Sequence, residues 1–148
     1  RLEPVSRGGL LSPRRMRERA DHWMRELAVR ADDADRVVST LSGGNQQKVL
    51  FARALLAQPK VLICDESVSM LDAEVQADVL ALLRTLQQQL GLSMIFVTHD
   101  LSVASGFCHR VIVLDRGKIV EEGPGDRILE MPQASISRTL VDACPRLP

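Results

Sequence analysis

Short apolar runs on either side of an amphipathic segment constrain the fold of this chain more than any other feature. Val61–Cys64 and Met94–Val97 are continuous apolar runs, and Ala73–Leu90 between them carries apolar residues at spacings of three and four. Continuous runs of this length are typical of strands buried on both faces of a sheet. A strand, a helix and a second strand in this order predict a largely parallel sheet flanked by helices. The sequence therefore predicts the α/β fold class.

Further elements are predicted on both sides of this core. Ser12 is a preferred helix cap and Pro13 suits the first helical position, so we expect a helix over Ser12–Arg30. After the polar stretch Ala31–Asp35, the other expected elements are helices from about Asn45 to Ala57 and from Leu101 to about Phe107, strands at Val111–Leu114 and Ile119–Glu121, and two short helices after the Gly123–Gly125 break. We therefore divide the chain into a helical part (residues 1–58), an α/β core (59–125) and a C-terminal helical extension (126–148).

The composition argues against several classes of function. The 148 residues are 45% hydrophobic and 26% charged, which fits a soluble globular protein. Nineteen basic residues balance nineteen acidic residues, so nothing favours a nucleic acid or an anionic membrane as a partner. No apolar run approaches the roughly 20 residues of a membrane span, and no secretory signal is visible. Three widely separated cysteines favour reduced thiols over a disulfide framework or a zinc site.

Polar side chains follow both predicted parallel strands. Asp65 and Glu66 come directly after Val61–Cys64, and His99 comes shortly after Met94–Val97. In open α/β sheets, residues just past the carboxyl ends of the strands line the ligand crevice. There, one carboxylate can organise a magnesium ion through water, and the next can orient an attacking water as a general base. Each residue alone also has an ordinary structural interpretation, as a strand end that reaches solvent or as a satisfied histidine.

The segment Leu41–Gln47 reads Leu-Ser-Gly-Gly-Asn-Gln-Gln and leads into a predicted helix. Gly43 and Gly44 let backbone amides approach a phosphate closely, and the helix directs its positive end toward the same place. Ser42 adds a hydroxyl donor. A glycine turn with a helix cap explains the same residues without any ligand, and Asp72 alone is an ordinary cap or first-turn residue of the next helix.

Together, and in this order, these segments resemble the motifs of the ATP-binding-cassette ATPases. Leu41–Asn45 match the signature motif Leu-Ser-Gly-Gly-Gln at four of five positions, and Val61–Glu66 resemble the Walker B strand. Ser69–Asp72 resemble the D-loop Ser-Ala-Leu-Asp, and His99 follows an apolar strand as the switch histidine of the family does. The resemblance covers nearly the whole chain. It implies the C-terminal part of a P-loop NTPase fold with part of the helical signature subdomain.

The resemblance implies ATP and Mg²⁺ as cofactors and assigns three residues to hydrolysis. Asp65 would hold Mg²⁺ through water, Glu66 would be the catalytic base, and His99 would contact the γ-phosphate. It also implies transmembrane permease subunits as partners, at the cytoplasmic face of the cell membrane, and a substrate-binding protein if the transporter is an importer. No nucleic acid is implied.

Other matching residues are expected to act across a dimer of two ATPase subunits. The resemblance implies that Asp72 couples the two sites of the dimer. It also implies that the signature residues bind the ATP held by the second subunit; these residues are Ser42, Gly43, Gly44 and Asn45.

The sequence also departs from the family pattern. Asn45 replaces Gln, Met70 replaces Ala, and Ser67 replaces the Pro that commonly follows Asp-Glu, but none of these changes removes a catalytic group. No GxxxxGK[ST] phosphate-binding loop occurs in the sequence. We expect this loop, the adenine-stacking residue and the Q-loop to lie upstream of Arg1, and we expect the chain alone to hydrolyse ATP negligibly. The alternative is that the other half is a separate chain.

One branch of the family is favoured by the details. Ile63–Ser69 and Val75–Leu80 resemble the oligopeptide, dipeptide and nickel importer ATPases, and Pro132–Pro145 partly resembles the C-terminal extension of that branch. The cargo is not readable, because transporter ATPases do not touch it. Two alternatives stay open: a non-transport cassette protein, such as a component of a phosphonate-degrading complex, and a non-catalytic interaction module. The lack of long coiled-coil heptads disfavours DNA-repair cassettes.

Overall fold

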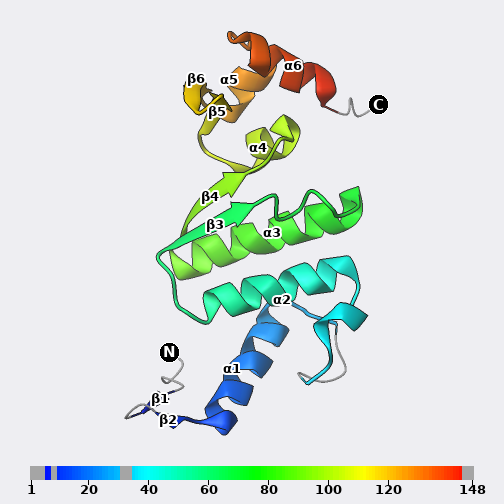
Figure 1. Cartoon of the computed structure of the whole chain (residues 1–148), viewed down its shortest axis with the longest axis vertical. Coiled ribbons are helices and arrows are strands. Elements are labelled where there is room, and N and C mark those ends of the chain that lie inside the picture. The colour runs from blue at the N-terminus through cyan, green and yellow to red at the C-terminus, as the bar shows by residue number, and fades with distance from the viewer. Residues whose placement is uncertain (1–5, 8–9, 31–34, 145–148) are drawn as a thin grey trace. The chain divides into compact units, whose positions relative to one another are not determined.

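The backbone divides into two compact units, and the division interrupts a strand. The computed structural model describes residues 6–7, 10–30 and 35–144 (Figure 1). The first unit comprises Arg1–Leu62 and Met70–Ser93, and the second comprises Ile63–Ser69 and Met94–Pro148. The helix predicted between the two apolar strands therefore belongs to a different unit from the residues that follow those strands. Each unit is described by itself.

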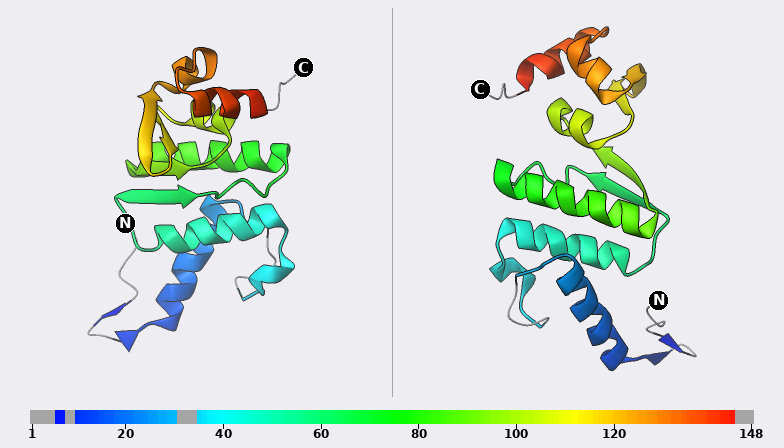
Figure 2. Two further views of the ribbon diagram at one scale, coloured as in Figure 1. Left: turned by 45° about the horizontal axis from the view of Figure 1, so that its top comes forward. Right: turned by 180° about the vertical axis from the view of Figure 1, so that it is seen from behind.

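Three helices build the first unit: α1 (Pro13–Glu26), α2 (Gly43–Leu55) and α3 (Ala73–Leu90). The views of Figures 1 and 2 place α2 between α1 and α3, and α2 contacts both. The same unit holds the short helix η1 (Val38–Thr40) and the antiparallel pair β1 (Ser6–Arg7) and β2 (Leu10–Leu11). The buried side chains that hold the helices together include Trp23, Leu27, Phe51, Leu55, Val79, Leu83 and Leu86.

The helix ends show which local signals are reliable. Ser12 caps α1 as predicted, with its hydroxyl accepting from the Arg15 N–H at 3.4 Å. The prediction that α1 continues to Arg30 is wrong: it ends at Glu26, and Ala28 takes a left-handed φ of 47°. The expected Asn45–Ala57 helix begins and ends two residues earlier. The predicted bounds of α3 are confirmed, including its stop at Gly91, which has a φ of 63°. Most of the polar Ala31–Asp35 stretch lies outside the described residues.

The second unit contains the strands and helices of the C-terminal half. Parallel strands β3 (Val61–Asp65, which begins in the first unit) and β4 (Ser93–Val97) pair with each other. Helix α4 (Leu101–Phe107) follows, with the bounds predicted for it. The antiparallel hairpin β5 (Val111–Asp115) and β6 (Lys118–Gly123) leads to α5 (Gly125–Glu130) and α6 (Ser135–Ala143), which are the two expected short helices. Its core comprises Leu101, Ala104, Val111, Val113 and Ile128.

Strands β3 and β4 form a parallel pair. Two hydrogen bonds fix the parallel pairing: Ser93 N–H donates to the Lys60 carbonyl near the start, and Glu66 N–H donates to the Val97 carbonyl at the end. Strands β5 and β6 are antiparallel, because a two-residue turn joins them. Among the described residues, the parallel part of the predicted sheet is therefore the pair β3 and β4.

The prediction that β3 and β4 are buried on both faces is wrong for the described residues. Burial alternates along β3: Cys64 is buried, whereas Ile63 keeps 66% of its surface exposed. On β4, Ile95 and Val97 are exposed as well. The physical reason is that the described residues supply apolar cover to only one face of these strands.

The C-terminal helix is fixed to the hairpin through a buried acid. The Glu121 carboxylate on β6 accepts from the Gln133 and Ala134 N–H groups at 3.0–3.1 Å, at the start of α6. Glu121 therefore links β6 to the two residues that lead into α6.

The described residues include neither a disulfide nor a helix that could span a membrane. Cys64, Cys108 and Cys144 form no disulfide, and burial raises the pKa of the Cys64 thiol to about 11. Among the helices that the structure describes, none combines the length and the apolar character that a membrane span needs.

We expect the 148-residue chain to associate with itself, because exposed apolar strand faces and unpaired strand edges favour pairing with another chain. Light scattering should show a mass that rises with concentration. Replacing Ile63→Thr and Ile95→Thr keeps β-branched residues in the strands and should shift the mass toward the monomer. Met131→Thr, an exposed apolar residue away from these strands, is the matched control. A monomer mass of the unaltered chain at every concentration would contradict the expectation.

Candidate active site

The carboxyl ends of β3 and β4 bring an acid and a histidine into direct contact. The Nδ1 atom of His99 lies 2.9 and 3.0 Å from the two carboxylate oxygens of Glu66. Parallel strands end at the same edge of a sheet, and the bond from Glu66 N–H to the Val97 carbonyl, at 2.9 Å, aligns these two ends. The structure therefore joins the two residues that the sequence predicted as catalytic.

The bond between them shifts the pKa of both groups. The hydrogen bond from His99 lowers the pKa of Glu66, and the same bond raises the pKa of His99. The side chains of His99 and Glu66 are 73% and 42% exposed, so water screens the interaction strongly. Glu66 is consequently an ionised, accessible carboxylate at neutral pH, which is the state that a general base requires.

Asp65 lies beside this pair along the chain, as the last residue of β3, and it is exposed. No group of three or more His, Cys, Asp or Glu side chains that could hold a metal is found in the described part of the chain. Mg²⁺ usually keeps several waters and binds through one or two carboxylates together with substrate phosphates. One accessible carboxylate at this strand end fits that mode of binding.

The glycine-containing loop lies in the first unit, at the start of α2. Ser42 is the N-cap residue of α2, and its hydroxyl oxygen accepts from the Asn45 side-chain amide at 2.9 Å. The Asn45 carbonyl oxygen accepts in turn from the Arg30 N–H at 2.8 Å. Both ends of the Asn45 amide are thus used inside the protein, so Asn45 orients the Ser42 hydroxyl in this structure. The hydroxyl proton of Ser42 is not needed for that bond.

Glycine occurs at the two positions of this loop for different structural reasons. A Cβ at Gly44 would clash with Cγ1 of Val75 on α3, whereas a Cβ at Gly43 would meet Leu71 at an ordinary 3.7 Å. Gly44 is therefore required by the packing of α2 on α3. Gly43 is exposed and has no such constraint, so its lack of a side chain leaves the first-turn N–H groups of α2 accessible to an anion.

Asp72 caps α3, with its carboxylate accepting from the Val75 N–H at 3.0 Å. The cap is the ordinary structural interpretation of this residue. Asp72 lies with Ser42, Gly43, Gly44 and Asn45 in the first unit, whereas Asp65, Glu66 and His99 lie in the second.

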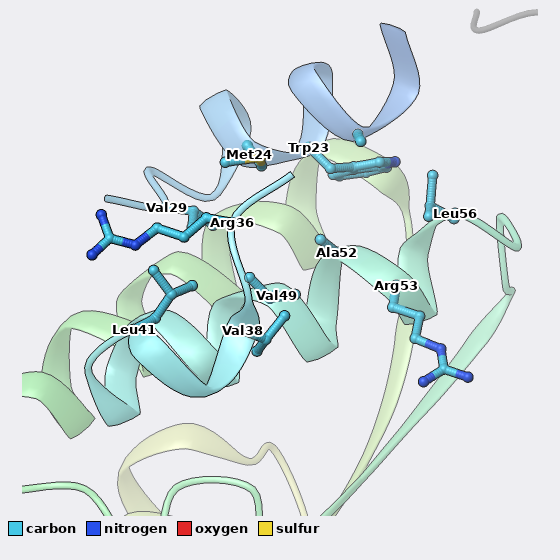
Figure 3. A pocket seen from close by; sticks show the side chains of 11 residues that line it. Trp23, Met24, Val29, Arg36, Val38, Leu41, Val49, Ala52, Arg53 and Leu56 are labelled. Atoms are coloured by element: carbon cyan, nitrogen blue, oxygen red, sulfur yellow. The ribbon is translucent and has the colours of Figure 1, made fainter. Parts of the chain in front are cut away.

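A pocket of about 150 Å³ opens among the helices of the first unit (Figure 3). Its lining is largely apolar and includes Trp23 of α1 and Ala52 of α2, but none of the predicted site residues. Leu41, which directly precedes Ser42, also lines it. The pocket therefore lies next to the start of the glycine-containing loop, and it is not the candidate site.

The structural roles of two residues were missed by the sequence analysis. Val75 is the reason for Gly44, and only the packing of two helices reveals it. Ser69 donates its hydroxyl to the main-chain carbonyl of Glu66 at 2.9 Å. A hydroxyl residue three positions after an acid at a strand end was the available signal, because serine commonly closes such turns.

Comparisons with known proteins identify the family of the chain. Residues 3–69 match the family described as ABC transporter. The chain is 41% identical over 144 residues to a putative peptide import ATP-binding protein of Brucella abortus, an alignment that covers 97% of this chain and 43% of the relative. It is 40% identical to the dipeptide transport ATP-binding protein of Escherichia coli, covering 98% and 43%. For the nickel import ATP-binding protein of Rhodospirillum rubrum the identity is 44%, covering 86% and 47%.

Solved structures give the same result for the fold. A dimeric bacterial ABC transporter cassette superposes with a TM-score of 0.68 at 32% identity, covering 80% of this chain and 50% of that one. The same cassette in a post-hydrolysis state, bound to ADP and phosphate, gives a TM-score of 0.68 at 31% identity and the same coverage. The fold is that of part of an α/β cassette of the P-loop NTPase class. The chain belongs to the ABC transporter family, and it spans less than half the length of the curated relatives described here.

We expect Gly44→Ala and Gly43→Ala to separate packing from ligand approach. Gly44→Ala should destabilise the protein by about 1–3 kcal/mol because the added methyl group overpacks against Val75. Gly43→Ala should change stability by less than about 1 kcal/mol. Thermal unfolding measures both. In a Val75→Ala background, Gly44→Ala should cost less stability than it does in the parent protein, because the clashing methyl group of Val75 is absent. Equal destabilisation by Gly44→Ala and Gly43→Ala would contradict the packing argument.

We expect the pKa of His99 to lie above its ordinary value and to fall in Glu66→Gln, because the amide carries no charge to stabilise the imidazolium. The stabilisation from His99 is complete below the pKa of an unfolded histidine and is lost as pH rises through the raised folded pKa. NMR titration of the imidazole measures the shift. Asp100→Asn should lower the His99 pKa less, since Asp100 contributes the smaller effect. An unchanged His99 pKa in Glu66→Gln would refute the coupling.

Proposed function

We propose that this protein is the ATP-binding and ATP-hydrolysing subunit of an ABC transporter. The observation that carries the proposal is the contact of the Glu66 carboxylate with His99 at the ends of β3 and β4. An ionised carboxylate at a strand end, held by an imidazole and next to a second accessible acid, suits the activation of water for attack on a phosphoryl group. The family of the chain and the ADP- and phosphate-bound cassette with a similar fold support this reaction.

Each residue of the strand-end site has a defined role in the proposed reaction. Glu66 accepts a proton from the attacking water at a carboxylate oxygen. His99 holds that carboxylate through Nδ1 and, at Nε2, donates to the γ-phosphate when it is protonated. Asp65 would hold a bound Mg²⁺ ion through water, and the ion would neutralise phosphate charge. The proton thus moves from water to Glu66, and protonated His99 stabilises the negative charge of the γ-phosphate.

The glycine-containing loop serves the ATP of a second ATPase subunit in this proposal. The Ser42 hydroxyl and the N–H groups of Gly43 and Gly44 at the start of α2 face the γ-phosphate held by that subunit. Asn45 orients Ser42, and Asp72 couples the two sites across the dimer. The support is that a solved cassette similar to this chain is dimeric.

The transporter is, in this proposal, an importer of peptides or nickel, since relatives at about 40% identity carry those descriptions. Its partners are transmembrane permease subunits and a substrate-binding protein. The ATPase subunit associates with the cytoplasmic face of the cell membrane through the permeases. Net charge zero fits partners other than nucleic acid.

We expect Glu66→Gln in the full-length protein to lower ATP turnover by roughly 100- to 10,000-fold, because the amide keeps the shape of the carboxylate but cannot take a proton from water. ATP should still bind, so size-exclusion chromatography with ATP should show an accumulated dimer. Glu130→Gln, which removes an exposed carboxylate on α5, is the matched control and should turn over normally. Parent-like turnover by Glu66→Gln would show that Glu66 is not the base.

A further inference from the structure

The backbone at Glu66 adopts a conformation that side chains disfavour. Its φ is 46°, in the left-handed region, where the Cβ of any residue other than glycine crowds the backbone. Such conformations persist only where surrounding contacts determine them, and they cluster at functional sites. Glu66 is also the residue whose carboxylate contacts His99. The contacts that hold this turn are therefore relevant to the proposed general base.

Both main-chain groups of Glu66 are held, one on each side. The N–H group donates to the Val97 carbonyl of β4 at 2.9 Å, which fixes the entrance to the turn. The carbonyl group accepts from the Ser69 hydroxyl at 2.9 Å. The main-chain N–H of Ser69 also approaches this carbonyl, but at 3.4 Å it makes the longer and weaker bond. The side chain of Ser69 thus supplies the better closure of the turn.

The residues around the turn indicate that the Ser69 hydroxyl holds the turn without being needed for the protein to fold. Val68, between the two ends of the turn, is 2% exposed and anchors it to the core of the protein. Ser69 is itself exposed, as is Glu66. Loss of the hydroxyl would let water reach the Glu66 carbonyl instead of leaving a buried group without a partner, so the protein would stay folded while the turn loosened.

We propose that Ser69 is a positioning residue for the general base: its hydroxyl closes the left-handed turn that aims the Glu66 carboxylate at His99 and at the attacking water. This inference rests on the proposed function, in which Glu66 is the base. Ser69 touches neither ATP nor water in this role and acts through the main chain of Glu66. A displaced base weakens catalysis without weakening ATP binding, because the groups that hold the nucleotide are unchanged.

The test is steady-state ATP hydrolysis by the full-length protein carrying Ser69→Ala. Misplacement of a catalytic group by about 1 Å costs up to ~100-fold in rate, so we expect kcat to fall by about 10- to 100-fold with KM for ATP nearly unchanged. Ser69→Thr keeps the hydroxyl, has room for its methyl group at this exposed position, and should restore kcat. Thr139→Ala is the matched control, since it removes a hydroxyl that also donates to a main-chain carbonyl, at 3.2 Å in α6, and it should leave kcat unchanged.

The double variant Glu66→Gln with Ser69→Ala distinguishes the two levels of the proposal. If Ser69 acts through Glu66, the double variant should be no slower than Glu66→Gln alone. Parent-like turnover by Glu66→Gln would overturn the proposed function itself. A slow Glu66→Gln together with a parent-like Ser69→Ala, or a Ser69→Ala loss that Ser69→Thr does not restore, would overturn the role of Ser69 alone. A rise in KM with unchanged kcat would also overturn it, by placing Ser69 in nucleotide binding.

Discussion

The parallel pairing of β3 with β4 is the constraint on which the candidate site depends. Because both strands run in the same direction, their carboxyl ends lie together, and Glu66 meets His99 although 33 positions separate them in the chain. The main-chain bond from Glu66 to Val97 extends the pairing one residue beyond β3. The left-handed turn then directs the chain away from the sheet. The acid and the imidazole thus acquire their geometry from backbone hydrogen bonds and not from the burial of their own side chains.

The exposure of this pair has a chemical consequence. A buried ion pair would have to overcome a large desolvation cost, and its carboxylate would be poorly accessible to water and nucleotide. Glu66 and His99 avoid that cost because both stay accessible, at the expense of a weak mutual attraction. Their alignment therefore depends on the rigidity of the backbone beneath them. That dependence explains why a hydroxyl bonded to the Glu66 carbonyl can matter for a side chain it does not touch.

The start of α2 follows a different principle. There the important groups are main-chain N–H donors and one hydroxyl, and the protein arranges them by packing. Gly44 lets α2 approach Val75 of α3, Leu41 lines the pocket beside α1 and α2, and Asn45 links Ser42 to the chain after α1. In the proposed function, donors that are already arranged in this way would need little reorganisation to bind a phosphate.

The sequence predicted those features that depend on local signals. The bounds of α3 follow from the Asp72 cap, the apolar stripe and Gly91. The proximity of Glu66 and His99 could also be predicted from the sequence, because the carboxyl ends of parallel strands lie at the same edge of a sheet. The exposed face of β3, the true reason for Gly44 and the use of Asn45 as a scaffold depend on contacts between segments far apart in the chain, which no local pattern encodes. The end of α1 was missed because an alanine, not a glycine, takes the left-handed conformation there.

The central claim is that the strand-end pair of one subunit and the glycine-containing loop of another act on the same ATP. The most direct measurement mixes two inactive full-length variants, Ser42→Arg and Glu66→Gln, with different tags so that mixed dimers can be isolated. In a mixed dimer, one site combines an intact Glu66 with an intact Ser42 from the other subunit. We expect isolated mixed dimers to regain ATP turnover, although each variant alone is inactive. Mixed dimers that stay as inactive as either variant would contradict it.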